Sequence, residues 1–300
     1  MRNEIKLITV LTPTYNRATY LHRCYDCLRE QTNFNFEWLI VDDGSTDNTK
    51  NEVKKIIDSA VIPVRYIYKE NGGKHTAVNL GVNNINTPLT VILDSDDLLD
   101  KNAIQEIEKI YNENCNKSNI CGFSFLKKYP NGKYMGDRFP IEGEYNYIDW
   151  RVNYVVTGDQ CDVFYTRCMR EFPFNVYPGE RFIGESTAWI RMAKKYNMIC
   201  KNIAIYMADY LEDGLTKRGR SLRINCPRGG MEYANLCMLK GVTWKRRIKS
   251  AALYIAYGTI VKEPLYDLIM NSNSKGWSIF MFPIGLITQY RWKQKYLGGK

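Results

Sequence analysis

A short apolar run ends directly in a cluster of carboxylates in the first third of the chain. Residues 90–93 read Thr-Val-Ile-Leu, and Asp94, Asp96 and Asp97 follow at once. The run carries no charge and contains β-branched residues, which predicts a buried strand. Carboxylates gathered at a strand end are costly unless a positive group lies beside them. A divalent cation would meet that need, and a solvated turn of aspartates is the alternative interpretation.

Two further apolar runs also end in polar clusters. Residues 7–11 lead into a polar segment at 12–17, and residues 38–41 lead into the acidic segment 42–47. Apolar positions at helical spacing occupy residues 18–31. Strands that alternate with helices indicate a largely parallel sheet with helices on its faces. Because ligands of such sheets bind beyond the carboxyl ends of the strands, we expect the three polar clusters to form one site.

Four motif-like segments occur in order within residues 5–100. They are Val10-Leu11-Thr12-Pro13-Thr14-Tyr15-Asn16-Arg17, Leu39-Ile40-Val41-Asp42-Asp43-Gly44-Ser45-Thr46-Asp47, Asn71-Gly72-Gly73-Lys74-His75-Thr76-Ala77-Val78-Asn79 and Leu93-Asp94-Ser95-Asp96-Asp97. Together they resemble the family 2 glycosyltransferases of the GT-A fold, which are inverting enzymes that use nucleotide sugars. The resemblance implies an α/β fold with a central mixed, mostly parallel sheet and helices on both faces.

The resemblance also implies where a nucleotide-sugar donor would bind. Asp43 would accept a hydrogen bond from a uracil ring if the donor carries uridine, and Asp42 is the less favoured of the pair. Lys74 would lie near the diphosphate, where its charge offsets that of phosphate. The implied donor contacts are Pro13, Thr14, Tyr15, Asn16, Arg17, Asp42, Asp43, Lys74, Asp94, Ser95 and Asp96.

A divalent metal, Mn²⁺ or Mg²⁺, is the cofactor that the resemblance implies. Asp94 and Asp96 would form the Asp-x-Asp motif of the family, in which one carboxylate bonds the ribose hydroxyls. Asp96 or Asp97 would hold the metal, and the sequence leaves both candidates open. The metal would act as a Lewis acid that neutralises charge on the leaving diphosphate.

Inversion in a single displacement requires a general base that deprotonates the acceptor hydroxyl. The resemblance places this base at a helix start, where Glu185 precedes apolar residues at helical spacing as far as Tyr196. A helix N-terminus would favour the ionised carboxylate. Glu185 is alternatively an ordinary helix-start acid, and Asp159 and Glu180 are the competing candidates for the base.

Positive charge is concentrated late in the chain. From Lys217 onward there are 16 Lys and Arg against 3 Asp and Glu, a net +13, whereas residues 1–216 carry −3. We therefore expect a GT-A catalytic domain over residues 1–216 and a basic, mainly helical region over residues 217–300. Apolar, aromatic-rich runs at 251–257 and 276–287 lie among these basic residues, and both are too short to span a bilayer.

This combination of basic and aromatic residues suits a contact with an anionic membrane surface, where a lipid-linked glycan acceptor would lie. The alternative is that the helices pack on the catalytic domain and leave their charges solvated. The nine cysteines have no disulfide-framework spacing, and residues 1–6 lack the apolar core of a secretion signal. We therefore expect a cytoplasmic protein, peripheral at the inner face of the cell membrane.

The sequence thus predicts a metal-dependent, inverting hexosyltransferase. The expected reaction moves a sugar from a UDP-sugar to a hydroxyl of a glycan acceptor in bacterial-type surface polysaccharide synthesis. A catalytically inactive relative that serves as a scaffold or partner subunit is the alternative. A nucleic-acid binder would explain the basic region, but acidic strand ends repel a phosphate backbone, so we expect no nucleic-acid partner.

Overall fold

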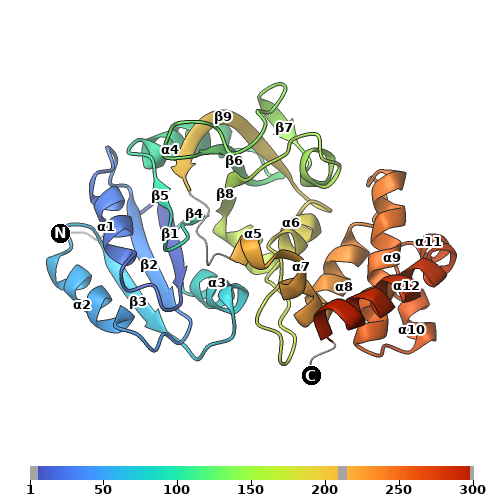
Figure 1. The fold of residues 1–300 in the computed structure, drawn as a ribbon. Helices are drawn as coiled ribbons and strands as arrows, with labels where there is room; N and C mark the ends of the chain where they lie inside the picture. Colours follow the sequence, from blue (N-terminus) through green and yellow to red (C-terminus); the bar gives the residue numbers. More distant parts are fainter. Residues whose placement is uncertain (1–5, 209–214, 298–300) are drawn as a thin grey trace. The chain divides into compact units, whose positions relative to one another are not determined.

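The computed structural model describes residues 6–208 and 215–297, and the chain divides into two compact units. The first unit comprises residues 1–146, 156–173 and 195–209, and the second comprises residues 147–155, 174–194 and 210–300. All the strands belong to the first unit (Figure 1). In the described part of the second unit, helices are the regular secondary structure.

A nine-stranded mixed sheet forms the centre of the first unit, in the order β3-β2-β1-β4-β8-β6-β9-β5, with β7 also paired to β9. Its parallel part consists of β1 (Ile8–Thr14), β2 (Phe36–Asp42), β3 (Val64–Tyr68) and β4 (Leu89–Ile92). The other strands are β5 (Leu98–Leu99), β6 (Ile120–Lys128), β7 (Gly143–Tyr145), β8 (Gln160–Tyr165) and β9 (Asn197–Met207). β8 runs antiparallel to its neighbours β4 and β6, which confirms the predicted mixed sheet.

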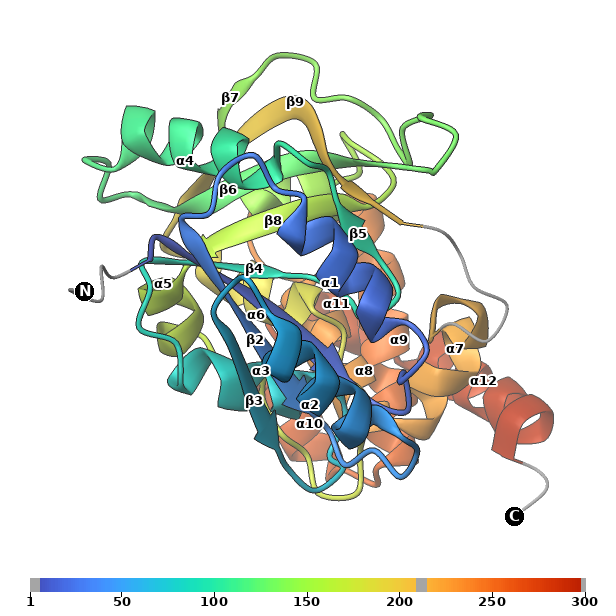
Figure 2. The ribbon, with the colours of Figure 1, turned by 90° about the vertical axis from the view of Figure 1, so that its left-hand side faces the viewer.

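Helices cover both faces of the parallel strands, as predicted. α1 (Leu21–Arg29) and α2 (Thr49–Ser59) connect strands in one direction across the sheet, and α3 (Lys74–Asn83) connects β3 to β4 in the other. Because such crossovers are right-handed, α1 and α2 share one face and α3 lies on the other. Figure 2 shows α1 and α2 in front of the strands. α4 (Ala103–Asn114) and α5 (Thr166–Glu171) complete the helices of this unit.

The apolar strand runs are buried on both sides, which explains why they read as continuous apolar stretches. Every residue of β1 is buried, and only Glu37 of β2 is not. Trp38 illustrates how strand and helix are fixed together. Its ring stacks on Tyr25 of α1 at a centroid distance of 6.4 Å, and its indole N–H donates to Thr12 Oγ1 at 2.9 Å.

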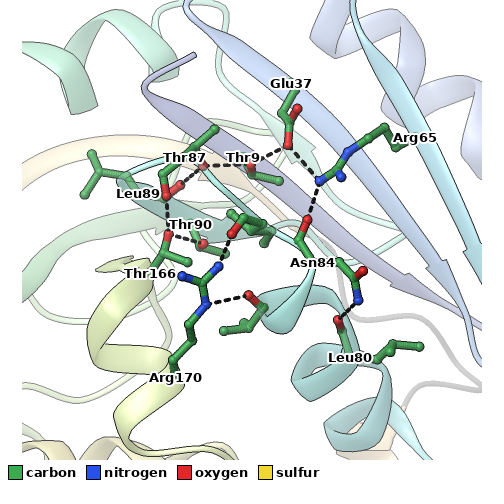
Figure 3. Close-up of polar contacts among 12 residues, drawn as sticks. Thr9, Glu37, Arg65, Leu80, Asn84, Thr87, Leu89, Thr90, Thr166 and Arg170 are labelled. Carbon is green, nitrogen blue, oxygen red and sulfur yellow. Dashed lines mark hydrogen bonds and ion pairs between the residues drawn. The ribbon is translucent and has the colours of Figure 1, made fainter. Parts of the chain in front are cut away.

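A network of hydroxyl groups joins the strands at their amino-terminal edge (Figure 3). Thr9 Oγ1 lies 2.7 Å from Thr87 Oγ1 and donates to Glu37 Oε1 at 3.0 Å. Thr166, which follows β8, donates to the carbonyl of Thr87 at 2.8 Å and lies 2.9 Å from Thr90 Oγ1. Because these buried hydroxyls have hydrogen-bond partners, the bonds offset the cost of removing them from water while they cross-link the strands. The polar clusters singled out above lie at the opposite, carboxyl edge.

The second unit is built around one long helix. Its helices are η1 (Ile148–Val152), α6 (Ser186–Met192), α7 (Leu215–Asn225), α8 (Pro227–Leu236), α9 (Trp244–Ile260), α10 (Leu265–Met270), α11 (Lys275–Phe280), α12 (Phe282–Trp292) and η2 (Lys293–Leu297). Residues 250–258 of α9 are buried except Leu253. Gly285 of α12 packs so closely that a Cβ there would lie 2.5 Å from Ile255 of α9. The predicted helical character of the basic region is confirmed, and its functional boundary near residue 217 stays a prediction.

Two general expectations can be compared with the structure directly. Within residues 6–208 and 215–297, no helix combines the length and the apolar character needed to cross a membrane. All nine cysteines are free thiols. Burial raises the pKa of the Cys27 thiol to about 11 and that of Cys24 well above its usual value, so both stay protonated in the packing of α1.

Candidate active site

The carboxyl ends of neighbouring parallel strands bring the predicted polar clusters together in the first unit. Thr14 at the end of β1 pairs in register with Asp42 at the end of β2. The N–H of Asp43 donates to the carbonyl of Thr14 at 2.8 Å, and the N–H of Leu93 donates to the carbonyl of Leu11 at 2.9 Å. The segments that follow β1, β2 and β4 therefore start side by side.

Asn16 ties the segment after β1 to the segment after β2. Its backbone is left-handed, with φ 51°, which asparagine tolerates better than most residues. Its side-chain oxygen accepts the N–H of Thr46 at 2.8 Å, and its own N–H donates to Ser45 Oγ at 2.9 Å. Tyr15 beside it is 46% exposed, so its ring is available to a ligand at this edge.

Asp42 is fully buried and closes the turn after β2. Its Oδ1 accepts the N–H of Ser45 at 2.7 Å, and its Oδ2 accepts the hydroxyl of Tyr66 at 2.7 Å. Burial and the neighbouring carboxylate raise the pKa of Tyr66 far above its usual value, which keeps that hydroxyl a donor. Both oxygens of Asp42 thus serve the fold.

Asp43 organises the segment between β3 and α3. Its buried carboxylate accepts the N–H groups of Gly72 at 3.0 Å and Gly73 at 2.7 Å. The ammonium of Lys69 donates to it at 2.6 Å and the amide of Asn71 at 3.2 Å. A carboxylate offers about four acceptor positions, so these donors fill it. Asp43 therefore fixes the short segment that leads into Lys74, the first residue of α3.

Two glycines allow the segments after β2 and β3 to touch. Gly44 has φ 83°, and a Cβ on it would lie 2.6 Å from the backbone nitrogen of Asn71. Gly73 has φ 96°, a conformation that other residues adopt only with strain. The glycines of the second and third sequence motifs are thus explained by backbone geometry.

The acidic turn after β4 receives its positive charge from lysine side chains. Lys74 Nζ lies 2.5 Å from Asp94 Oδ1. Burial acts to raise the pKa of Asp94, but the charges of Lys74 and Lys127 outweigh it and hold the pKa below its usual value. The expected positive partner of the turn is therefore present in the protein itself.

Asp97 is turned into the protein and is held by Tyr206 of β9. The hydroxyl of Tyr206 donates to Asp97 Oδ2 at 2.8 Å and accepts the N–H of Asp94 at 3.1 Å. Lys127 Nζ lies 4.0 Å from the centroid of the Tyr206 ring. Burial and the charge of Asp94 raise the pKa of Asp97 to about 7. Sequence reasoning missed Tyr206 and Lys127, because their contacts with the turn join distant parts of the chain.

Asp96 has a different environment from its two neighbours. It is half-buried, and among the described residues no side chain donates a hydrogen bond to it. Burial and the charge of Asp94 raise its pKa, and the charges of Arg17 and Lys74 act against that rise. Ser95 between the two carboxylates is buried, and its carbonyl accepts the thiol of Cys24 at 3.2 Å.

The described residues contain no cluster of three or more Asp, Glu, His or Cys side chains that could enclose a metal by themselves. Mg²⁺ is commonly held by one or two carboxylates, with substrate phosphates and water completing its shell, and Mn²⁺ favours the same oxygen ligands. Asp96 supplies a carboxylate of this kind. The donor set therefore fits a divalent metal that binds together with a diphosphate.

Glu185 lies in the second unit, immediately before α6. Its carbonyl accepts the N–H of Ala188 at 3.0 Å, as expected for a helix start. The helix ends at Met192, which is earlier than the apolar spacing predicts. Tyr196 instead stands directly before β9, where its hydroxyl donates to Glu171 Oε2 at 2.9 Å.

The two competing candidates for a base differ in their surroundings. Glu180 in the second unit accepts the N–H groups of Arg228 at 2.7 Å and Gly229 at 2.9 Å. It therefore satisfies the first turn of α8 and has a structural role. Asp159 lies in the first unit, one residue before β8.

Comparison with known proteins gives a family match and shared folds. The model of glycosyl transferase family 2 matches residues 9–176. The chain is 36% identical over 102 residues to glycosyltransferase GlyA of Streptococcus pneumoniae, which covers 34% of this chain and 14% of GlyA. The matched segments cover between 14% and 40% of the length of GlyA and of three uncharacterised glycosyltransferases of Rickettsia.

Two solved structures share the architecture of the chain. TarS of S. aureus, in complex with UDP-GlcNAc, has a TM-score of 0.62 at 16% identity, covering 96% of this chain and 92% of that one. A mannosyltransferase of Pyrobaculum calidifontis, in complex with GDP-Man and Mn²⁺, has a TM-score of 0.58 at 14% identity, covering 96% and 88%. At these identities the shared property is the fold, which is of the predicted GT-A type.

The raised pKa of Asp97 predicts how stability depends on pH. An aspartate titrates near 4 in an unfolded chain, so a folded pKa of about 7 means that the native state favours the protonated form. The stability of the wild type should therefore fall between pH 4 and pH 7, by at most about 4 kcal/mol from this group. Asp97→Asn should remove that part of the decline.

Urea unfolding at pH 5 and pH 8, with chelator present, measures this difference. The matched control is Asp58→Asn, which changes an exposed aspartate of α2. If the wild type and Asp97→Asn lose the same stability between the two pH values, Asp97 does not titrate as described.

Proposed function

Because the chain belongs to glycosyl transferase family 2, we propose that it is an inverting enzyme that transfers a sugar from a nucleotide-diphosphate donor to a hydroxyl of a glycan acceptor. The observation that carries this proposal is the arrangement after β4. The ion pair of Lys74 with Asp94 stands beside the half-buried Asp96 at the carboxyl edge of the parallel strands. A diphosphate brings negative charge that Lys74 and a metal can accept, which is the charge balance that donor binding requires.

A UDP-sugar is the donor that we favour. TarS, which has the same fold, is solved with UDP-GlcNAc. Pro13, Thr14 and the exposed ring of Tyr15 would line the base, with Asn16 and Arg17 at the end of the same segment. Asp43 is our candidate for the uracil N–H, which would then replace Lys69 or Asn71 as a donor to its carboxylate.

We assign the metal to Asp96 and not to Asp97. Asp97 is buried and bonded to Tyr206, whereas Asp96 is half-buried beside it. A bound Mn²⁺ or Mg²⁺ would supply Lewis-acid stabilisation of the leaving diphosphate. Asp94 and Ser95 would contact the ribose, and Lys74 would exchange part of its contact with Asp94 for phosphate.

Glu185 is our candidate for the general base. It would take the proton of the acceptor hydroxyl as that oxygen bonds to the anomeric carbon and the bond from this carbon to the diphosphate breaks. Its position at the start of α6 favours a negative charge. Glu180 already accepts two backbone N–H groups of α8, which is why we favour Glu185 over it.

We also propose that the second unit docks on an anionic membrane that carries a lipid-linked acceptor. Large apolar side chains are exposed along α10, α11 and α12, namely Leu265, Tyr266, Ile279, Phe280, Ile284, Ile287 and Tyr290. Arg291, Lys293 and Lys295 follow directly. Exposed apolar groups beside basic ones are typical of proteins that lie on lipid surfaces. Free thiols at all nine cysteines suit the cytoplasmic side of such a membrane.

Asp96→Ala tests the metal assignment and the enzyme proposal together. Release of nucleotide diphosphate from a panel of sugar nucleotides should require Mn²⁺ or Mg²⁺ and should fall about a hundredfold or more in this variant. Asp58→Ala, in an exposed part of α2, should retain the activity. If Asp97→Ala loses the metal dependence of this release and Asp96→Ala keeps it, Asp97 and not Asp96 is the metal ligand. If the wild type neither binds nor turns over any donor, an inactive scaffold replaces the enzyme proposal.

Glu185→Gln keeps the shape of the side chain and removes its basicity. Transfer to an acceptor should slow by about a hundredfold or more, because a general base typically contributes this much. Donor affinity, measured by calorimetry, should stay within about twofold, since the change affects proton transfer and not donor contacts. A variant that transfers sugar at the normal rate would exclude Glu185 as the base.

Membrane docking predicts binding to phosphatidylglycerol vesicles and weaker binding to neutral phosphatidylcholine vesicles. Replacing Ile279 and Phe280 by serine should lower the vesicle partition coefficient roughly tenfold or more, because each side chain contributes about 1.5–3 kcal/mol when buried. Val61→Ser with Ile141→Ser is the matched control, since both residues are exposed in the first unit. Equal partitioning of the two double variants would contradict docking through α11.

A further inference from the structure

A guanidinium group with no carboxylate partner among the described residues lies half-buried in the second unit. Arg246 of α9 donates to the hydroxyl of Tyr233 at 2.8 Å and to the hydroxyl of Tyr154, and its carbon Cζ lies 4.3 Å from the centroid of the Tyr154 ring. Its Nε is buried without a hydrogen-bond partner. Among the residues with described positions, no carboxylate forms an ion pair with Arg246.

The groups around this charge are neutral: the phenols of Tyr154 and Tyr233 and the thiol of Cys237. Burial is the main cause that raises the pKa of Tyr233, to about 12, so its hydroxyl is uncharged at neutral pH. Charged groups removed from water are usually paired, because an unpaired one loses hydration without compensation. An anion beside Arg246 would supply the missing charge.

A second guanidinium meets the same tyrosine. Arg223 of α7 lies with Cζ 5.6 Å from the centroid of the Tyr233 ring. The charges of Arg223 and Arg220 both act to lower the pKa of Tyr257, which burial raises. Positive charge therefore gathers around Tyr233 from α7 and α9.

Nearby acids are committed to other partners. Glu232, next to Tyr233 on α8, accepts from Asn175 and Tyr177 at 3.0 Å and lies 3.5 Å from Arg191. Glu263 pairs with Arg228 at 3.0 Å. In the described part of the unit, these contacts leave the arginines around Tyr233 with phenol partners.

Tyr154 adds an exposed aromatic ring to this cluster. It is 59% exposed and has φ 58°, a left-handed conformation that is unfavourable for a bulky residue. The preceding Asn153 pins the turn, because its side chain donates to the carbonyl of Gly241 at 3.0 Å and accepts the N–H of Thr243 at 2.9 Å. Strain that the surroundings enforce is commonly found where a side chain must be presented to a ligand.

We propose that Arg246, Arg223 and Tyr154 form a binding site for a glycosyl phosphate group of the acceptor. The guanidinium groups would bind the phosphate oxygens, and the exposed face of the Tyr154 ring would pack against the sugar. The proposal rests on the proposed transfer to a glycan, and it names the chemical class of the acceptor. Phosphate in a lipid headgroup shares the same chemistry and is a separate arm of the test.

Glucose 1-phosphate, methyl glucoside and inorganic phosphate are suitable soluble probes. Their binding would be measured by calorimetry with UDP and Mn²⁺ present in excess, so that the donor site is occupied. Glucose 1-phosphate should bind about tenfold more tightly than either partial probe, because charge-assisted bonds and ring contact then act together. Equal affinity of glucose 1-phosphate and methyl glucoside for the wild type would overturn the proposal.

Substitutions separate the two parts of the site. Arg246→Gln and Arg223→Gln should each remove the advantage of glucose 1-phosphate over methyl glucoside. Tyr154→Ala should bind glucose 1-phosphate no more tightly than inorganic phosphate. Tyr154→Phe, which keeps the ring, should still bind glucose 1-phosphate more tightly. Lys249→Gln is the matched control, because it removes an exposed positive charge from the same helix α9. If Lys249→Gln loses as much affinity as Arg246→Gln, the effect is one of net charge and the site is excluded.

Two further readouts separate this proposal from its alternatives. Phosphatidylglycerol vesicles without acceptor test whether the arginines bind a lipid headgroup. The acceptor proposal fails if Arg246→Gln loses vesicle binding and the wild type binds glucose 1-phosphate no more tightly than methyl glucoside. The arginines would then be a site for lipid phosphate. Donor hydrolysis by the wild type reports on the transferase proposal alone. Hydrolysis without sugar-phosphate binding would refute this inference and leave the proposed function intact.

Discussion

The carboxylate of Asp43 is the contact on which the arrangement of the first unit's site depends. It accepts hydrogen bonds from the backbone N–H groups of Gly72 and Gly73, the ammonium of Lys69 and the amide of Asn71, all in the segment between β3 and α3. Lys74 is the next residue, and its ammonium reaches Asp94 in the turn after β4, a strand that lies two positions from β2 in the sheet. One buried acid therefore couples the geometry of β2 to the charge of the acidic turn.

Three aspartates in one turn acquire three different properties from their surroundings. Lysine charges lower the pKa of Asp94, burial beside Tyr206 raises that of Asp97, and Asp96 remains half-buried without a side-chain donor among the described residues. The surroundings of each aspartate, and not its residue type, thus set the direction of its pKa shift. This difference supports placing a metal at Asp96, a choice that residue identity alone leaves open.

The sequence alone predicts those parts of the fold and of the site that depend on neighbouring residues in the chain. Runs buried on both faces mark β1, β2 and β4, and the polar residues after them identify the carboxyl edge. Tyr206 escaped notice because it meets Asp97 across 109 residues of chain. The end of α6 was misjudged because Asn197 pairs with Ile120 of β6, and this strand pairing overrides the helical spacing near Tyr196. Arg246 stands out only when its partners are known to be phenols.

The hydroxyl network at the amino-terminal edge bears on how the sequence of such a protein can evolve. Thr9, Thr87, Thr90 and Thr166 cross-link strands that are far apart in sequence, and none of them belongs to a segment at the carboxyl edge. Mutations in the segments at the carboxyl edge therefore leave these cross-links untouched. A chain of this design can accumulate substitutions at that edge over evolutionary time while its strands keep their register.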